Sequence, residues 1–259
     1  MTARKLAAFL AVWAVVLASL TLAKGTRHRR PPAGDHVGHL NVGGVGRTYI
    51  LHIPESLPES VPVPLVLVFH GGGGHAATMP NFTRFDSLAE QEKFLAAYPE
   101  SFNKSWNDTR GLSLADDVGF IRALIAGLQR THHTDPKRTY AAGISNGGFF
   151  SNRLACDLTD KLAAIAAVAA TMPETLVPVC KPSAPISVMF MHGNKDPLVH
   201  IDGGPVLRDR GVAICLAQAA AFWRKLDGTS AQPAFLIEKA SHNLDATQTV
   251  WDFFTRHTR

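Results

Sequence analysis

The sequence predicts an α/β domain with a mostly parallel, doubly wound sheet and an antiparallel hairpin at its N-terminal end. Three observations lead to this fold class. From residue 61 onward, apolar runs of strand length alternate with segments of helical spacing, as in βαβ units. Several of these runs are apolar on both faces, which is typical of central parallel strands. Candidate catalytic groups follow three of the runs, and sites in such sheets lie beyond the carboxyl ends of the strands.

The elements are expected in the following order. Two strands at 36–42 and 47–53 are joined by Gly43-Gly44, which is a hairpin signal. Further strands are predicted at 61–69, 94–98, 137–143, 162–170 and 184–191, and helices at 86–93, 116–128, 146–156 and 212–226. A short last strand at 235–238 and a helix at 245–255 complete the domain.

Composition limits the class of function. The chain has 259 residues, 46% of them hydrophobic and 18% charged, so it can bury a full core in one main domain. A net charge of +5 with scattered Lys and Arg does not indicate a nucleic-acid partner. No group of Cys and His has the spacing of a metal site, so no metal is expected.

The first 35 residues are expected to lie outside that domain. Arg4 and Lys5 precede an uncharged apolar stretch up to residue 23, the pattern of a secretory signal peptide. The stretch is longer than most signal cores, so an uncleaved membrane anchor, with the domain facing outside, stays open. Residues 24–35 are basic and contain Pro, which indicates a solvated linker. We therefore expect a secreted domain at 36–259 that meets a membrane only if residues 1–23 are retained.

The candidate nucleophile is Ser145, within the run GISNGG at 143–148. A Gly-x-Ser-x-Gly between a strand and a helix holds its serine in a strained, exposed turn, and the glycines avoid clashes with neighbouring backbone. The motif alone is weak, because this chain has 21 glycines. Its place between the strand at 137–143 and the helix at 146–156 is the more specific signal.

A second motif follows the buried strand at 61–69. The run HGGGG at 70–74 can point backbone N–H groups into an open cleft, as an oxyanion hole requires. We expect the donors to be the N–H of Asn146 and one from Gly72 or Gly73. A phosphate-binding loop is less favoured, because neither the Walker lysine nor the Rossmann glycine spacing is present.

Two further residues could complete a catalytic triad. Asp196 follows the strand at 184–191 and would hold the tautomer of a catalytic histidine, although Asp196-Pro197 is equally typical of a turn. His242 lies after the last predicted strand, where the general base belongs. In a chain with 12 histidines, a surface loop histidine is the competing interpretation.

Other conspicuous residues have simpler interpretations beside functional ones. Trp106 is a candidate substrate-binding residue, but its ring could equally pack in the core. Asp116 and Asp117 begin a helix, where their negative charges interact favourably with the helix dipole. We prefer this interpretation to a catalytic carboxylate pair. Among the three cysteines, Cys156 with Cys180 is the preferred disulfide, and spacing excludes neither other pairing. Cys215 is expected as a buried thiol inside a helix.

Together these motifs resemble the polyhydroxybutyrate depolymerase and feruloyl or acetylxylan esterase family of secreted α/β-hydrolases. The motifs that carry the resemblance are FHGGGG at 69–74, SWN at 105–107, ADDV at 115–118, GISNGG at 143–148, HGNKD at 192–196 and WDFF at 251–254. The resemblance covers about residues 36–227 well. It implies a serine esterase without a cofactor. Its substrate would be a short polyester or an acyl group on a plant polysaccharide, so the partner is an ester, which can be polymeric.

The chain departs from this family near its C-terminus. Members carry a glycine-rich segment with the catalytic histidine, and no such segment is present here. In one alignment, a strand and the histidine loop near residues 228–233 have been lost and His242 is not the base. In the other, the Ile-Glu of 237–238 followed by His242 matches the family's histidine segment with its glycines replaced. The corresponding alternative function is a catalytically impaired, secreted binding protein.

Overall fold

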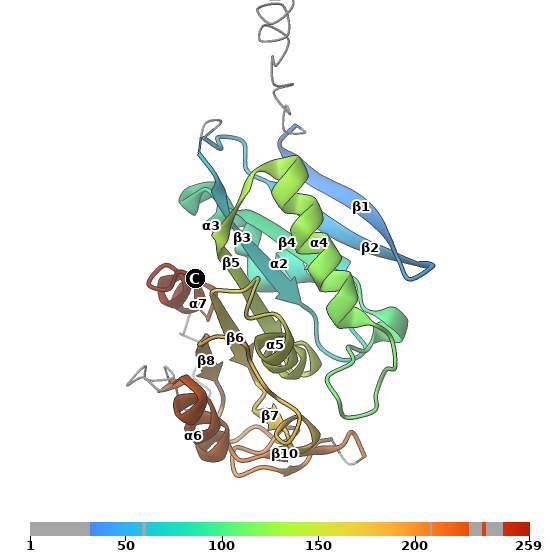
Figure 1. The fold of residues 1–259 in the computed structure, drawn as a ribbon, viewed down its shortest axis with the longest axis vertical. Helices are drawn as coiled ribbons and strands as arrows, with labels where there is room; N and C mark the ends of the chain where they lie inside the picture. The colour runs from blue at the N-terminus through green and yellow to red at the C-terminus, as the bar shows by residue number, and fades with distance from the viewer. Residues whose placement is uncertain (1–31, 59–60, 208, 228–234, 237–245) are drawn as a thin grey trace, which may run out of the picture. The chain divides into compact units, whose positions relative to one another are not determined.

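An eight-stranded sheet forms the centre of the computed structural model, which describes residues 32–58, 61–207, 209–227, 235–236 and 246–259 (Figure 1). Its strand order is β1-β2-β4-β3-β5-β6-β8-β11. The pairs from β4 through β11 are parallel, whereas β2 pairs antiparallel with both β1 and β4. The predicted fold class, a mostly parallel sheet with an antiparallel N-terminal hairpin, is therefore confirmed.

The strands of this sheet are β1 (Gly34–Val42), β2 (Val45–Ile53), β3 (Val63–Phe69), β4 (Leu95–Pro99), β5 (Thr134–Ile144), β6 (Ala164–Val168), β8 (Ser187–Met191) and β11 (Phe235–Leu236). A small second sheet has the order β7-β10-β9, with β7 at Met172–Pro173, β9 at Gly204–Pro205 and β10 at Val212–Ile214. The helices are α2 (Met79–Thr83), α3 (Phe85–Glu92), α4 (Asp117–His132), α5 (Asn146–Asp157), α6 (Leu216–Asp227) and α7 (Ala246–Phe254). Three short 3₁₀ turns lie at Ala76–Thr78, Phe102–Lys104 and Glu174–Leu176.

The N-terminal hairpin forms where the two glycines predicted it. Val42 pairs with Val45, so Gly43 and Gly44 form a two-residue loop. Their φ angles are 59° and 83°. Two-residue hairpin loops of this kind need positive φ at both central positions, which glycine adopts without strain. β1 begins at Gly34, so the last two residues of the predicted linker belong to the sheet.

Central strands are buried on both faces, as their continuous apolar sequence predicted. All seven residues of β3 are buried. Leu65, Leu67 and Phe69 face a core shared with α4, α5 and α6, while Val66 and Val68 face a second core shared with α3 and α7. Figure 1 shows α4 and α5 covering one face of the sheet. Because both faces of β3 are packed, the C-terminal end of the strand, where the glycine run at 70–74 begins, is held in place.

The predicted helix at 212–226 is wrong at its start. Residues 212–214 form β10, which pairs with β7 and β9, and α6 begins at Leu216. Cys215 is half-buried and precedes that helix rather than lying inside it. Its Sγ accepts from the Gln218 N–H at 3.4 Å, and its own N–H donates to Gln218 Oε1 at 3.3 Å. This reciprocal pair resembles a capping box and explains why the helix starts there.

The predicted signal peptide or anchor at 1–23 lies outside the described residues. Within the described part of the chain, none of the helices is both long and apolar enough to cross a bilayer.

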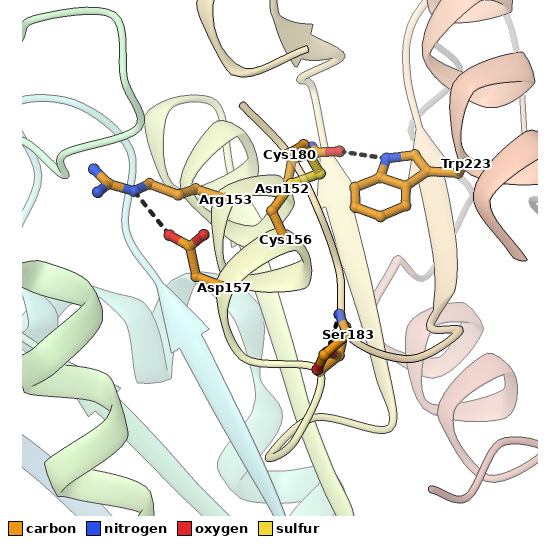
Figure 2. Close-up of a disulfide and its surroundings, with 8 residues drawn as sticks. Asn152, Arg153, Cys156, Asp157, Cys180, Ser183 and Trp223 are labelled. Atoms are coloured by element: carbon orange, nitrogen blue, oxygen red, sulfur yellow. Dashed lines mark hydrogen bonds and ion pairs between the residues drawn. A yellow bond between two sulfur atoms is a disulfide. The ribbon is translucent and has the colours of Figure 1, made fainter. Parts of the chain in front are cut away.

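Cys156 and Cys180 form a disulfide, which was the preferred pairing from the sequence (Figure 2). The bond joins the end of α5 to the loop before β8. On the same helix, Asn152 Oδ1 accepts a hydrogen bond of 3.1 Å from Trp223 Nε1 on α6. α5, which follows the candidate nucleophile, is therefore held by a covalent bond near its C-terminal end and by a buried hydrogen bond near its middle.

We expect replacement of both Cys156 and Cys180 by serine to destabilise the protein by about 3 kcal/mol, because the disulfide closes a loop of 24 residues in the unfolded chain. Urea unfolding followed by circular dichroism measures the change. Cys215→Ser is the matched control, because it removes a thiol outside the disulfide and keeps an N-cap acceptor. Equal midpoints for the double variant and the wild type would show that the bond contributes nothing to stability.

Candidate active site

Ser145 occupies the sharp turn between β5 and α5. Its φ of 53° and ψ of −118° are a strained conformation for a residue with a side chain, which costs about 1–3 kcal/mol. Two backbone hydrogen bonds hold the turn: the Ser145 N–H donates to Val168 O at 2.8 Å, and Ser145 O accepts from the Phe149 N–H at 2.9 Å. Strain retained in this way is typical of a functional residue.

The glycines around Ser145 are required by packing. A Cβ at Gly143 would lie 2.2 Å from Gly147 O, and one at Gly147 would lie 2.5 Å from Phe69 O. Neither contact can be relieved by a side-chain rotation, because both involve backbone atoms. The Gly-x-Ser-x-Gly spacing therefore lets α5 start directly against the ends of β3 and β5.

The glycine run after β3 lies against this turn. The Cβ position at Gly71 is 3.6 Å from Ser145 Cβ, and that at Gly72 is 3.6 Å from Asn146 Cβ. The Gly73 N–H donates to Lys104 O at 2.8 Å, so it is not available as an oxyanion donor. Of the two glycines predicted for this role, Gly72 remains, and its N–H has no partner among the described residues.

His70 positions the glycine run and was not singled out from the sequence. It is 1% exposed, and its Nδ1 donates to Gly71 O at 2.8 Å. Its Nε2 faces the Ser101 N–H at 3.3 Å and Glu100 Oε1 at 3.4 Å. Burial alone would raise the pKa of Glu100, but hydrogen bonds from His70 and the Ala76 N–H outweigh it and lower that pKa. Both ring nitrogens are thus engaged away from Ser145.

A buried polar network fixes Asn146, whose N–H is the other predicted oxyanion donor. Asn146 Oδ1 accepts from the Trp106 N–H at 2.7 Å, and Nδ2 donates to Asp108 Oδ2 at 2.7 Å. Asp108 is fully buried and pairs with Arg110 at 2.5 Å. The Arg110 guanidinium in turn lies 3.8 Å from the centre of the Phe149 ring. The segment 106–110 therefore clamps the first turn of α5.

Trp106 does not line a cleft. Its ring is 0% exposed, stacks on Phe150 at 5.0 Å and donates from Nε1 to His70 O at 3.0 Å. No surface of the ring is left for a substrate, so the predicted substrate-binding role is corrected to a positioning role. Trp106 supports the site through its backbone N–H, which donates to Asn146, and through its buried ring, which donates to His70 O.

Asp108→Ala is expected to destabilise the fold by about 3–5 kcal/mol, because it leaves the Arg110 charge buried without its partner. Asp160→Ala is the matched control. The Arg122–Asp160 pair is about half exposed, and its loss should cost about 1 kcal/mol or less. Urea midpoints of the two variants test the difference, and equal shifts would contradict the structural role of Asp108.

Asp196 lies on the loop after β8, as predicted. Its Oδ1 accepts the N–H groups of Leu198 and Val199 at 2.9 and 3.0 Å, which fixes the carboxylate, and its Oδ2 has no hydrogen bond among the described residues. His192, at the end of the same strand, is 2% exposed and donates from Nε2 to Val199 O at 2.8 Å. This hydrogen bond from His192 to Val199 O helps to hold the loop that contains Asp196.

Asp117 has an ion-pair partner in addition to its predicted place at the start of a helix. It begins α4 but is buried, and it pairs with Arg47 of β2 at 2.6 Å. It also accepts the Asn107 N–H at 2.8 Å, so it helps to hold the segment that clamps Asn146. Asp116 caps the helix by accepting from the Gly119 N–H at 2.8 Å. These contacts of the two carboxylates with described residues are structural: an ion pair with Arg47 and hydrogen bonds from backbone N–H groups.

His242 lies outside the described residues, but the elements on either side of it are described. β11 is the last strand of the main sheet and pairs parallel with β8, Leu236 opposite Met191. The C-terminal ends of β8 and β11 therefore lie at the same edge of the sheet. At the other end, Ala246 of α7 and Ile144, the residue before Ser145, line one apolar pocket with Phe82 and Val168.

The fold and the strained serine define the chain as an α/β-hydrolase. Residues 48–213, more than half of the chain, match the family described as esterase PHB depolymerase. The chain therefore belongs to this family, which confirms the resemblance seen in the sequence.

Curated relatives agree with this assignment. NocK of Nocardia uniformis subsp. tsuyamanensis is 36% identical over 68% of this chain and 53% of its own length. Feruloyl esterase B of Piromyces equi is 29% identical over 72% of this chain and 37% of its own length. The chain thus spans about half or less of these two relatives. Feruloyl esterase C of Emericella nidulans is 28% identical over 71% of this chain and 66% of its own length.

Solved structures support the fold. A crystal structure of a thermostable esterase superposes with a TM-score of 0.64 at 15% identity, covering 87% of this chain and 63% of the other. A ferulic acid esterase superposes with a TM-score of 0.61 at 13% identity, covering 87% of this chain and 98% of the other. At such low identity the likeness concerns the fold alone.

Proposed function

We propose that this protein hydrolyses carboxylic esters by nucleophilic catalysis, with Ser145 as the nucleophile. The observation that carries the proposal is the strained Ser145 turn beside two N–H groups, of Asn146 and Gly72, that have no partner among the described residues. Attack of Ser145 Oγ on the ester carbonyl would place the developing oxyanion near these donors. Such preorganised donors typically contribute about 10²–10³-fold each to kcat.

Asp196 and His242 complete the proposed triad. Asp196 would accept the Nδ1–H of His242, and Nε2 would remove the proton from Ser145 and later give it to the leaving alcohol. The order of the sheet supports this pairing, since Asp196 follows β8 and His242 follows β11, the neighbouring parallel strand. His242 lies four positions before Ala246, a reach of up to about 14 Å of extended chain. Ala246 and Ile144, the residue before Ser145, line the same pocket.

The presence of β11 favours one of the two alignments left open by the sequence. If the last strand had been lost together with the histidine loop, no strand would be expected beside β8 before α7. β11 occupies that position. On this alignment His242 corresponds to the family's catalytic histidine.

The names of the relatives support a substrate class for this proposal. Two of them are named feruloyl esterases, and a bifunctional acetylxylan esterase/xylanase of Neocallimastix patriciarum is 26% identical over 61% of this chain. We infer an acyl group on a polysaccharide or a short polyester as the substrate. The apolar pocket beside Ile144 would accept an apolar part of such an ester.

Secretion is part of the same proposal. It is supported by the charged start and apolar stretch of residues 1–23 and by the Cys156–Cys180 disulfide, a bond that persists in oxidising compartments.

The alternative is a binding protein on the same scaffold without turnover, which the absence of the family's glycine-rich histidine segment favours. Turnover of 4-nitrophenyl acetate and 4-nitrophenyl butyrate by the wild type beside Ser145→Ala separates the two. Equal rates for both proteins would remove Ser145 from the mechanism.

A further inference from the structure

The guanidinium of Arg210 lies at the glycine run. Its Nη1 is 2.8 Å from the position that a Cβ would take at Gly72, and Asn146 Cβ is 3.6 Å from the same position. The space that the guanidinium occupies therefore exists because residue 72 has no side chain. Gly72 and Asn146 are the two proposed oxyanion donors, so a positive charge stands directly beside the reacting centre.

A tight turn between β9 and β10 presents Arg210. The Arg210 N–H donates to Val206 O at 3.0 Å, and the Val206 N–H donates to Gly211 O at 2.9 Å. Arg110 Nη1 donates to Arg210 O at 3.1 Å. Since Arg110 is itself held by Asp108, the buried network that fixes Asn146 also fixes the backbone of Arg210.

The charge of Arg210 has no protein partner among the described residues. Arg110 and Arg47 are both buried in ion pairs, with Asp108 and Asp117. Arg210 is only half-buried, and no carboxylate or carbonyl of the described residues accepts from its guanidinium. An arginine that is fixed at its backbone but free at its planar cationic end is suited to bidentate binding of a carboxylate.

We propose that Arg210 selects esters that carry a carboxylate close to the scissile bond. This inference rests on the proposed ester hydrolysis and names the charge of its substrate. The carboxylate can belong to the acyl part, as in a half-ester of a dicarboxylic acid. It can also belong to the alcohol part, as in an acylated uronic acid. Both present the same planar anion to the guanidinium.

The test compares matched esters with wild type, Arg210→Gln and Arg210→Lys. 4-Nitrophenyl hemisuccinate against 4-nitrophenyl butyrate probes the acyl side, and 4-acetoxybenzoate against 4-acetoxybenzamide probes the alcohol side. For the pair that carries the carboxylate on the recognised side, the ratio of kcat/KM of the anionic ester to kcat/KM of the neutral ester should fall in Arg210→Gln. The expected fall is about tenfold to a hundredfold, the effect of losing one hydrogen bond to a charged group. Arg210→Lys should retain part of the ratio, because it keeps the charge and loses the bidentate geometry.

The exposed Arg224 on α6 supplies the control, since Arg224→Gln removes the same charge elsewhere and should leave the ratio unchanged. An unchanged ratio for both pairs in Arg210→Gln, with both rates lowered together, would overturn selection and show that Arg210 acts on the oxyanion itself. An unchanged ratio with unchanged rates would also overturn the proposal.

Binding separates this inference from the proposed function. Titration calorimetry with the non-hydrolysed amides succinanilate and 4-acetamidobenzoate, beside neutral butyranilide and 4-acetamidobenzamide, needs no turnover. Tighter binding of one carboxylate, lost in Arg210→Gln, would support the anion site even if no ester were hydrolysed. Turnover with no carboxylate preference in either rate or binding would leave the esterase standing and remove the role of Arg210.

Discussion

Ser145→Ala is expected to lower kcat/KM for 4-nitrophenyl butyrate by about 10⁴-fold or more, leaving a residual rate above water from the oxyanion donors and binding. The reason is that alanine keeps the strained turn but removes the hydroxyl that forms the acyl-enzyme. The fold should be retained, because no described residue forms a hydrogen bond with the Ser145 hydroxyl. Spectrophotometric release of 4-nitrophenolate measures the rate, and circular dichroism checks the fold.

Ser56→Ala is the control, because Ser56 is an exposed serine on the loop after β2. It should hydrolyse the ester at the wild-type rate. A Ser145→Ala protein that is folded and as active as Ser56→Ala would contradict nucleophilic catalysis at this turn.

His242→Ala is expected to have the second large effect, a loss of about 10³–10⁶-fold in kcat, since it removes the proposed general base for Ser145. The loss should appear mainly in kcat rather than in KM, because the imidazole transfers the proton during the chemical step and does not bind the substrate. His39→Ala removes an exposed histidine of β1 and should have no effect. The same steady-state assay measures all three proteins.

Two results would reject His242 as the base. A kcat close to that of the wild type would show that another group accepts the proton. A wild-type rate no higher than that of His242→Ala and Ser145→Ala would favour the binding protein without turnover.

The main sheet could be predicted because its signals are local. Gly43-Gly44 marked the hairpin, and strands such as β3 are apolar throughout, since helices cover both faces. The serine turn could be predicted as well, because a strand, a Gly-x-Ser-x-Gly and a helix follow each other within a few residues. The glycines that make the motif recognisable in the sequence are the same glycines that the packing requires, because a Cβ at Gly143 or Gly147 would clash with backbone atoms.

What could not be predicted depends on contacts between distant residues. Strands of two or three residues, such as β7, β9 and β10, are too short to show a period, so the sequence around β10 predicts the start of a helix instead. Asp117 pairs with Arg47, 70 residues earlier, and nothing near either residue indicates the partner. Trp106 was marked as a site residue, but whether its ring or its backbone served the site required the hydrogen bonds to Asn146.

Arg210 was missed for the same reason. Its sequence neighbours carry no motif, and its relation to the site appears only when the β9–β10 turn is placed beside Gly72. In the sequence, the glycine at position 72 has a sufficient explanation in the predicted oxyanion loop, so it does not indicate that an arginine side chain lies against it.

The most direct test of the account is the site of labelling by diethyl 4-nitrophenyl phosphate, an organophosphate that reacts with activated serines. Peptide mass spectrometry of the labelled protein should find the diethylphosphoryl group on Ser145, with labelling abolished in Ser145→Ala and slowed in His242→Ala. Absence of any adduct on the folded wild type, or an adduct on another residue that persists in Ser145→Ala, would contradict a nucleophilic serine at the end of β5.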